Sequence, residues 1–210
     1  LGIDRMSLAI NAMGDPCKET PAIHIAGTNG KGSIAAFINS VLSLVNIKTG
    51  VTTSPHLVDW VERICINKTP ISKEEFQSLS LSLSPIAKKY SLTPFECVIA
   101  IALKYFTLRE VELLILEVGL GGRLDATTAH QYRPIIAFGA IGLDHCEYLG
   151  NSLEKVAIEK AAVITTKSTV ITATQHNIVK RVFEETAKRK QAVIHWVDPI
   201  PSDWELGLSG

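Results

Sequence analysis

Short apolar runs alternate with amphipathic segments along most of the chain. The apolar runs predict strands at 22–26, 48–53, 112–118, 135–141, 169–173 and 192–197. Segments with apolar residues at helical spacing predict helices at 4–13, 31–46, 93–108, 152–160 and 176–190. Near-continuous apolar strands separated by helices are typical of a parallel sheet that is covered on both faces. We therefore predict an α/β fold with a mostly parallel sheet and helices on both faces.

Two further segments predict an additional edge strand and an additional helix. Residues 60–66 alternate between polar and apolar positions, which predicts a strand at the edge of the sheet. Ser72 and Glu75 form a capping-box pattern that opens a further helix, and Pro85 should end or kink it.

Composition narrows the class of protein. Hydrophobic residues make up 46% of the 210 residues, and 21 basic residues balance 21 acidic ones, so a nucleic-acid-coating surface is not expected. The cysteines are scattered without a C-x-x-C pair, which favours the reducing cytoplasm and argues against a zinc knuckle. The apolar runs are too short to span a bilayer, and no signal peptide is recognisable, so we expect no membrane partner.

Polar residues stand where the predicted strands end. The first strand leads into 27-GTNGKGS-33, the second into Ser54, the third ends at Glu117, and the fourth leads to Asp144 and His145. Ligands of such sheets lie beyond the carboxyl ends of the strands. These groups together therefore predict one site for a polyphosphate and a divalent cation.

The glycine-rich loop departs from the common P-loop, because Lys31 is followed by Gly32 and only then by Ser33. Glycines allow backbone N–H groups to approach phosphate oxygens, and the following helix points its positive end at the same place. Ser33 could serve a metal or phosphate, or cap its helix. The simpler alternative is a tight connection that binds nothing.

The other candidates also have two interpretations. Glu117 ends a buried apolar run, where a cation would compensate its charge, although a paired or solvent-reaching glutamate is the plain alternative. His145 beside Asp144 is either a metal ligand or a structural histidine. Its neighbour Cys146 is not expected to act as a nucleophile. By its spacing alone, Lys160 is a surface lysine.

Six motifs occur in a fixed order: AGTNGKGS, TSPHLV, ERI-x-IN, LEVGLGGRLDAT, DH-x3-LG and EKA-x-VI. Together they closely resemble folylpolyglutamate synthase and its bifunctional form with dihydrofolate synthase, within the Mur ligase superfamily. Such enzymes are about twice this length. The resemblance implies that residues 1–210 are an N-terminal ATP-binding domain of the Mur ligase central type, truncated at both ends and without the C-terminal glutamate ligase domain.

The resemblance also implies roles for individual residues. The ATP-binding loop would consist of Thr28, Asn29, Gly30, Lys31, Gly32 and Ser33. The magnesium ligands would be Ser54, Glu117 and His145. Contacts to the pteroate portion of the substrate would come from Thr93, Leu124, Phe95 and Leu1, although Thr93 also fits a helix cap. Catalysis would depend on Lys31, His145 and a Lys160 carbamylated by carbon dioxide.

The implied activity is an ATP-dependent ligation of L-glutamate to dihydropteroate, to the glutamate tail of folates, or to both, through an acyl phosphate. It would use ATP and Mg²⁺ at two sites, without flavin, haem or zinc, in a cytoplasmic monomer of folate and one-carbon metabolism.

Three alternatives remain open. A cell-wall Mur ligase shares the GTNGK loop, but TSPHL and GLGGRLDAT favour the folate branch. A GTPase-type switch would need an N-K-x-D motif, and the sequence has none. A non-catalytic nucleotide-binding module is the third alternative, for this chain in isolation.

Overall fold

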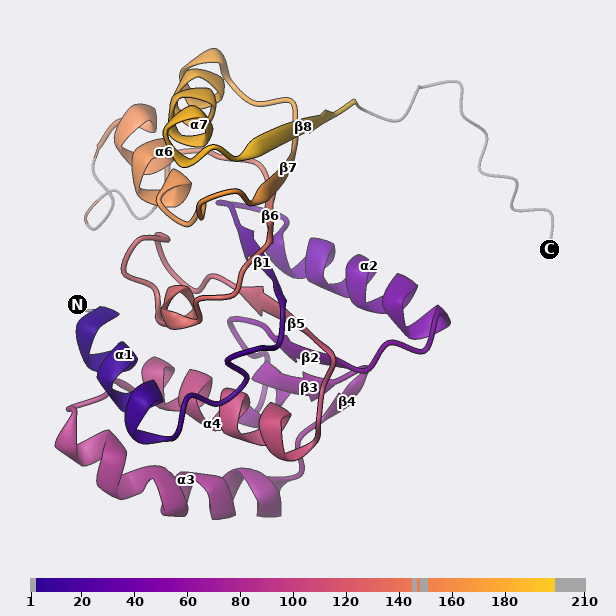
Figure 1. Ribbon diagram of the computed structural model, residues 1–210, viewed down its shortest axis with the longest axis vertical. Coiled ribbons are helices and arrows are strands. Elements are labelled where there is room, and N and C mark those ends of the chain that lie inside the picture. Colours follow the sequence, from indigo (N-terminus) through magenta and orange to yellow (C-terminus); the bar gives the residue numbers. More distant parts are fainter. Residues whose placement is uncertain (1–2, 145–146, 148–150, 199–210) are drawn as a thin grey trace.

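A computed structural model describes residues 3–144, 147 and 151–198 (Figure 1). Its strands form one sheet in the order β4-β3-β2-β5-β1-β6-β7-β8. The strands are β1 (Ala22–Ala26), β2 (Thr49–Thr52), β3 (Ile64–Ile66), β4 (Thr69–Pro70), β5 (Leu113–Glu117), β6 (Ile135–Phe138), β7 (Thr169–Ala173) and β8 (Val193–Val197). From β2 to β8 in that order the neighbours are parallel, and β3 and β4 add an antiparallel edge. The predicted mostly parallel α/β fold is confirmed.

Helices cover both faces of the sheet. They are α1 (Ile3–Ala12), α2 (Lys31–Leu44), α3 (Lys73–Lys89), α4 (Pro94–Leu108), α6 (Leu153–Ala161) and α7 (Asn177–Lys190), with short 3₁₀ turns η1 (Trp60–Arg63) and η2 (Ala126–Ala129). Within the described part of the chain, α2 lies on one face and the other helices lie on the opposite face (Figure 1). None of the helices in this part has the length and apolar character to cross a membrane.

The central strand β1 contributes to the cores on both faces. Ile23 and Ile25 pack in the cluster under α2, whereas Ala22 and Ala26 belong to the clusters on the opposite face. Successive side chains of a strand point to opposite faces, so His24 also points away from α2. This placement puts a histidine inside the layer that contains α1, α4 and η2.

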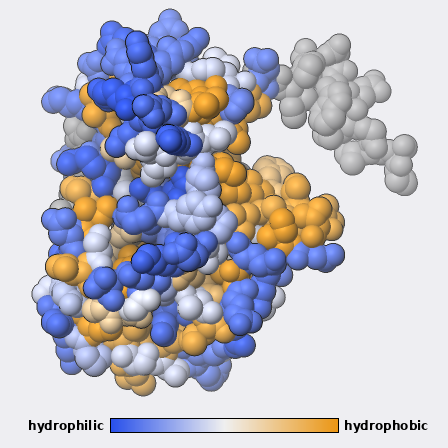
Figure 2. All heavy atoms as spheres, in the orientation of Figure 1, coloured by the Kyte–Doolittle hydropathy of each residue, from blue (hydrophilic) through white to orange (hydrophobic). Residues whose placement is uncertain are grey.

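The outer face of α2 carries an apolar stripe. Phe37, Val41 and Leu44 are 74%, 62% and 83% exposed. Their spacing places them on one side of the helix, away from the sheet. Figure 2 shows the corresponding apolar patch at the position that α2 occupies in Figure 1.

Two sequence-based expectations need correction. Of residues 60–66 only Ile64–Ile66 form a strand, because Asp59 and Glu62 make a capping box that winds the preceding residues into η1. Helix α3 does not end at Pro85 but continues to Lys89. Neighbouring apolar residues of α3 pack into the core, and this packing outweighs the hydrogen bond that proline cannot make.

The packing of α4 against β2 leaves no room for a side chain at Gly50. A Cβ added there would lie 2.7 Å from Cγ of the fully buried Phe106. We therefore expect Gly50→Ala to lower the free energy of unfolding by about 1–3 kcal/mol, as overpacked cores do. Denaturant titration measures this loss. Gly142→Ala is the matched control, since its methyl group would meet no atom within 4 Å. Equal stability of the two variants would contradict the prediction.

Candidate functional site

The glycine-rich loop between β1 and α2 is fixed by the loop that follows β6. The backbone N–H of Thr28 donates to the Ala140 carbonyl at 2.8 Å, and the Thr28 hydroxyl bonds Gly142. Gly27 has φ +148°, and a Cβ there would stand 3.0 Å from the Gly139 backbone. Gly30 has φ +81° and caps the start of α2. The loop conformation thus depends on glycine and on contacts to the neighbouring strand end.

Two lysines converge on this loop. Lys31 Nζ donates to the Gly27 carbonyl at 3.1 Å, and Lys160 Nζ donates to the same oxygen at 2.9 Å. Lys160 is only 4% exposed, so the expectation of a surface lysine from spacing alone is wrong. Burial and the charge of Lys31 lower the pKa of Lys160 to about 8. A neutral amine is therefore accessible near physiological pH.

A buried carboxylate lies beside the same loop. Glu117 at the end of β5 is 4% exposed, and its Oε2 accepts the backbone N–H of Ser54 at 3.1 Å. A Cβ added at Gly32 would lie 3.8 Å from that oxygen. Burial raises the pKa of Glu117, whereas the Ser54 hydrogen bond and the charge of Lys31 act against this rise. The Glu117 carboxylate beside Ser54 therefore forms an anionic corner next to the start of α2.

A cavity of about 680 Å³ opens in front of these groups. Its wall combines loop, helix and strand-end residues, namely Thr28, Lys31, Ser54, Pro55, Arg63, Thr93, Phe95, Glu96, Gly119, Leu120, Gly121, Arg123, Leu124, Asp125, Ala126, Asp144 and Glu159. The predicted pteroate contacts Thr93, Phe95 and Leu124 are all in this wall. Thr93 also caps α4, because its hydroxyl accepts the N–H of Glu96, so both expected roles are available to it.

The structure thus brings the loop, Ser54, Glu117 and Lys160 together, along with the three wall residues. His145 and Leu1 lie outside the described residues. Among the residues that are described, no group of three or more His, Cys, Asp and Glu side chains is close enough to hold a metal ion.

Two arginines of the cavity wall were not singled out from the sequence. Arg63 donates through Nε to Nδ1 of His56 and lies 4.6 Å from the ring of Trp60. Arg123 pairs with Glu159 at 3.1 Å. Arg63 belongs to the motif ERI-x-IN and Arg123 to GLGGRLD, so membership in these motifs is the sequence feature that could have indicated both arginines.

Asp125 holds the turn that follows β5. Its Oδ2 accepts the backbone N–H groups of Gly119 and Leu120 at 2.9 and 3.0 Å, and its Oδ1 accepts that of Thr127 at 2.9 Å. Gly119 packs closely on Phe95, since a Cβ there would lie 2.7 Å from the ring. One carboxylate therefore determines the shape of one wall of the cavity.

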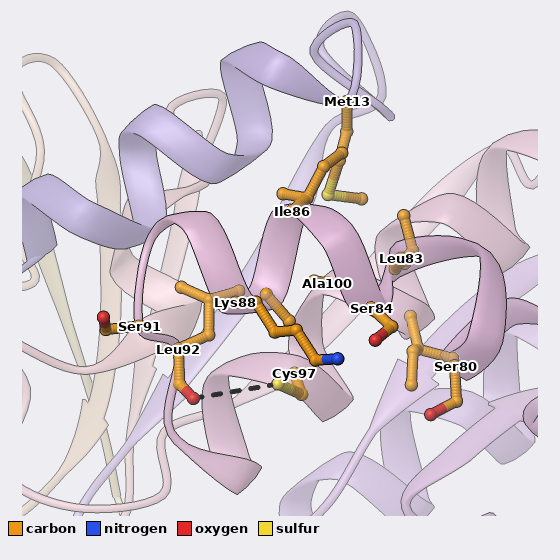
Figure 3. Close-up of a pocket in the computed structure, with 12 residues that line it drawn as sticks. Met13, Ser80, Leu83, Ser84, Ile86, Lys88, Ser91, Leu92, Cys97 and Ala100 are labelled. Carbon is orange, nitrogen blue, oxygen red and sulfur yellow. Dashed lines mark hydrogen bonds between the residues drawn. The ribbon is translucent and has the colours of Figure 1, made fainter.

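A second cavity of about 330 Å³ lies between α3 and α4 (Figure 3). Leu83, Ile86 and Ala100 contribute apolar side chains to its lining, and Lys88 contributes a charged one. Cys97 also lines it, 4.0 Å from the Leu92 carbonyl, and burial raises the pKa of this thiol. This cavity shares no lining residue with the first one.

Comparison with known proteins places the fold and the loop in a family. The profile of the Mur ligase middle domain matches residues 25–197. Dihydrofolate synthetase of Saccharomyces cerevisiae is 39% identical over 194 residues, which cover 90% of this chain and 45% of the yeast protein. Dihydrofolate synthase/folylpolyglutamate synthase of Bacillus subtilis is 37% identical over 91% of this chain and 46% of its own. The chain thus spans about half the length of these curated relatives.

Solved structures agree with the sequence relatives. Folylpolyglutamate synthase of Mycobacterium tuberculosis, complexed with ADP and AMPPCP, superposes with a TM-score of 0.88 at 32% identity, over 93% of this chain and 47% of its own. The E. coli protein FolC in complex with DHPP and ADP gives a TM-score of 0.87 at 31% identity, with 93% and 47% covered. The chain therefore belongs to the Mur ligase family, through the middle domain of that family.

Proposed function

We propose that this chain is the ATP-binding part of an ATP-dependent ligase that joins L-glutamate to dihydropteroate, to folates, or to both. The observation that carries the proposal is the convergence of Lys31 and Lys160 on the Gly27 carbonyl, where Lys31 also lines the large cavity. Positive charge at a glycine-rich helix start fits a polyphosphate. The related structures with ADP and the relatives' names support ATP and a folate-type acceptor.

The reaction would proceed in two displacement steps. A carboxylate oxygen of the acceptor attacks the γ-phosphorus of ATP, the bond to the bridging oxygen breaks, and ADP leaves with that electron pair. The amine of L-glutamate then attacks the acyl carbon, loses a proton, and expels inorganic phosphate to leave an amide. The protein needs no nucleophile of its own. Lys31 and the backbone N–H groups of the loop would neutralise charge on the transferred phosphoryl group.

The residues at the anionic corner fit Mg²⁺. A buried carboxylate whose pKa is raised by burial gains from a cation, and carboxylate and hydroxyl oxygens are the hard ligands that Mg²⁺ prefers. Glu117 and Ser54 would hold the ion, with His145 as the further ligand that the resemblance implies. When bound, the ion would supply charge neutralisation between the phosphate groups. The presence of two magnesium sites remains a prediction.

Lys160 would act as a carbamate. Its neutral amine adds to carbon dioxide, forming an N–C bond and releasing a proton, so that a buried cation becomes an anion. The product would relieve the repulsion between Lys160 and Lys31, which both donate to one carbonyl. It would also add a carboxylate near the cation site.

The pteroate portion of the acceptor would lie against Phe95 and Leu124, with Thr93 at the start of α4. Leu1 remains a predicted contact. The relatives extend well beyond the length of this chain, and we propose that a C-terminal domain of the same protein completes the site and binds the incoming glutamate. A cytoplasmic monomer without nucleic-acid partners also remains a prediction.

The cell-wall Mur ligases are the alternative within this family. Against them stand the wall built by GLGGRLD and Phe95, and the names of the relatives described above.

The first test is a phosphate-release assay on the full-length protein with ATP and L-glutamate. We expect release with dihydropteroate, tetrahydrofolate or both as acceptor, and only background with a UDP-muramoyl peptide. Residues 1–210 alone serve as the control and should turn over little. Turnover with the peptide acceptor alone would favour the cell-wall alternative, and nucleotide binding without turnover on any acceptor would favour the non-catalytic module.

Glu117→Gln tests the cation site. The amide keeps the shape and can still accept from Ser54, but it loses the charge that a cation requires. We expect Mg²⁺-dependent turnover to fall about 100-fold or more, with an unchanged melting temperature in the absence of Mg²⁺. Glu74→Gln, an exposed glutamate of α3, is the matched control. Near-normal turnover of Glu117→Gln would refute the assignment.

Carbamylation is tested by ¹³C NMR of the full-length protein in ¹³CO₂. A carbamate signal should be present in the wild type, absent in Lys160→Ala and retained in Lys155→Ala, which changes an exposed lysine of the same helix. Only the neutral amine reacts, and the pKa is about 8. At constant CO₂, formation should therefore accelerate about tenfold per pH unit below pH 8 and level off above it. A signal that survives in Lys160→Ala would disprove the site.

A further inference from the structure

A chain of buried hydrogen bonds leads from the interior of the domain to the cavity wall. Nη1 of Arg133 lies 3.0 Å from Nδ1 of His24, and Nε2 of His24 lies 2.8 Å from the Thr127 hydroxyl. That hydroxyl lies 2.5 Å from Oδ1 of Asp125. Each of the four side chains is at most 7% exposed. The chain is therefore shielded from solvent along its length.

With Asp125 ionised, the hydrogens along this row of hydrogen bonds have one order. Burial raises the pKa of Asp125, whereas the hydrogen bonds from Thr127, Leu120 and Gly119 act against this rise. The Asp125 oxygens accept three backbone N–H groups, and in the ionised form that these bonds favour the carboxylate has no hydrogen to donate. The one hydroxyl hydrogen of Thr127 must therefore point to Asp125, so its oxygen accepts from Nε2 of His24. Nδ1 of His24 is then free of hydrogen and accepts from Arg133, a group that can only donate.

The charges at the two ends of the chain do not touch. Burial and the nearby Arg133 hold the pKa of His24 well below its usual value, so the ring is neutral. Burial lowers the pKa of Arg133 to about 10, which leaves it cationic at neutral pH. None of the ion pairs within the described ranges of the chain includes Arg133. The polarised chain thus links the Arg133 cation to the Asp125 anion.

We propose that Arg133 and His24 are positioning residues for the acceptor, and that they act through Thr127 and Asp125. Arg133 and His24 do not line the large cavity, so they reach the acceptor only through the wall that Asp125 holds. That wall contains the Gly119–Leu120 turn, which packs on Phe95. The inference rests on the proposed function, because it assigns this wall to the pteridine acceptor.

Electrostatics explains why the wall needs this support. The cavity is also lined by the cationic side chains of Arg63 and Arg123. An Asp125 without the hydroxyl bond and the charge behind it would be drawn towards these cations or would take up a proton. Either change would release the backbone N–H groups of the turn, and the apolar wall would shift. The phosphate loop, held by its own contacts to Ala140 and Gly142, would remain in place.

The test compares Thr127→Val with Thr127→Ser in the full-length enzyme. Valine keeps the volume but breaks two links of the chain, whereas serine keeps the hydroxyl. We expect Thr127→Val to raise KM for the pteridine acceptor about tenfold or more, with KM for ATP changed less than about twofold. Thr127→Ser should stay near the wild type. An unchanged acceptor KM in a folded Thr127→Val enzyme, or equal rises for ATP and acceptor, would overturn the proposal.

A second pair and a spectroscopic readout cover the case in which Thr127→Val does not fold. Arg133→Met should raise the acceptor KM, and Arg133→Lys, which keeps charge and donor, should restore much of it. In ¹⁵N-histidine NMR of the wild type, assigned with His24→Gln, His24 should carry its proton on Nε2. A proton on Nδ1 would refute the proposed order of hydrogen bonds from Arg133 to Asp125. Absence of glutamate ligation by the wild type would instead refute the proposed function. The NMR result would still show whether the hydrogen bonds run in the proposed order.

Discussion

Two ammonium groups meet at one carbonyl oxygen, and the arrangement of the site follows from that concentration of positive charge. Lys31 and Lys160 both donate to the Gly27 carbonyl, and burial together with the charge of Lys31 lowers the pKa of Lys160. Two cations at one oxygen repel each other, so a rigid backbone and a nearby anion favour such a pair. The rigidity comes from the close approach of Gly27 to Gly139. Under the proposed function, Lys31 and the backbone N–H groups of the loop would bind phosphate, and carbamylation would convert Lys160 from a second cation into an anion.

The two carboxylates of the site are held in different ways, and this separates their tasks. The Glu117 carboxylate accepts the N–H of Ser54 in the described part of the chain, which leaves acceptor capacity for a cation, although the charge of Lys31 partly compensates the carboxylate. Asp125 accepts three backbone N–H groups and a hydroxyl, which leaves its lone pairs occupied. A carboxylate with occupied lone pairs is suited to hold a wall, whereas an incompletely compensated one is suited to bind an ion.

The sequence predicts the sheet well because short, near-continuous apolar runs that alternate with amphipathic helices are typical of the strands of a covered parallel sheet. It also predicts Glu117, since a charge at the end of such a run needs a partner. Lys160 is different. Its helix carries several charged residues, and no periodicity reveals that one lysine turns inward to a carbonyl 133 positions earlier in the chain. His24 is hidden for a similar reason, because a histidine within an apolar strand shows its partners only after the layers are packed.

The position of β1 at the centre of the sheet explains how phosphate and acceptor would keep a fixed spacing under the proposed function. The strand ends in the loop that carries Lys31, and His24 on the same strand, three residues before Gly27, anchors the chain to Asp125. Three residues of strand span about 10 Å. Under the proposed function, a single strand would therefore position both the phosphate loop and the acceptor wall, and attack of a carboxylate on phosphorus needs such a constant distance. Motion of the acceptor wall relative to the phosphate loop would disturb this alignment, and the buried hydrogen bonds oppose such motion because they link Asp125 to β1.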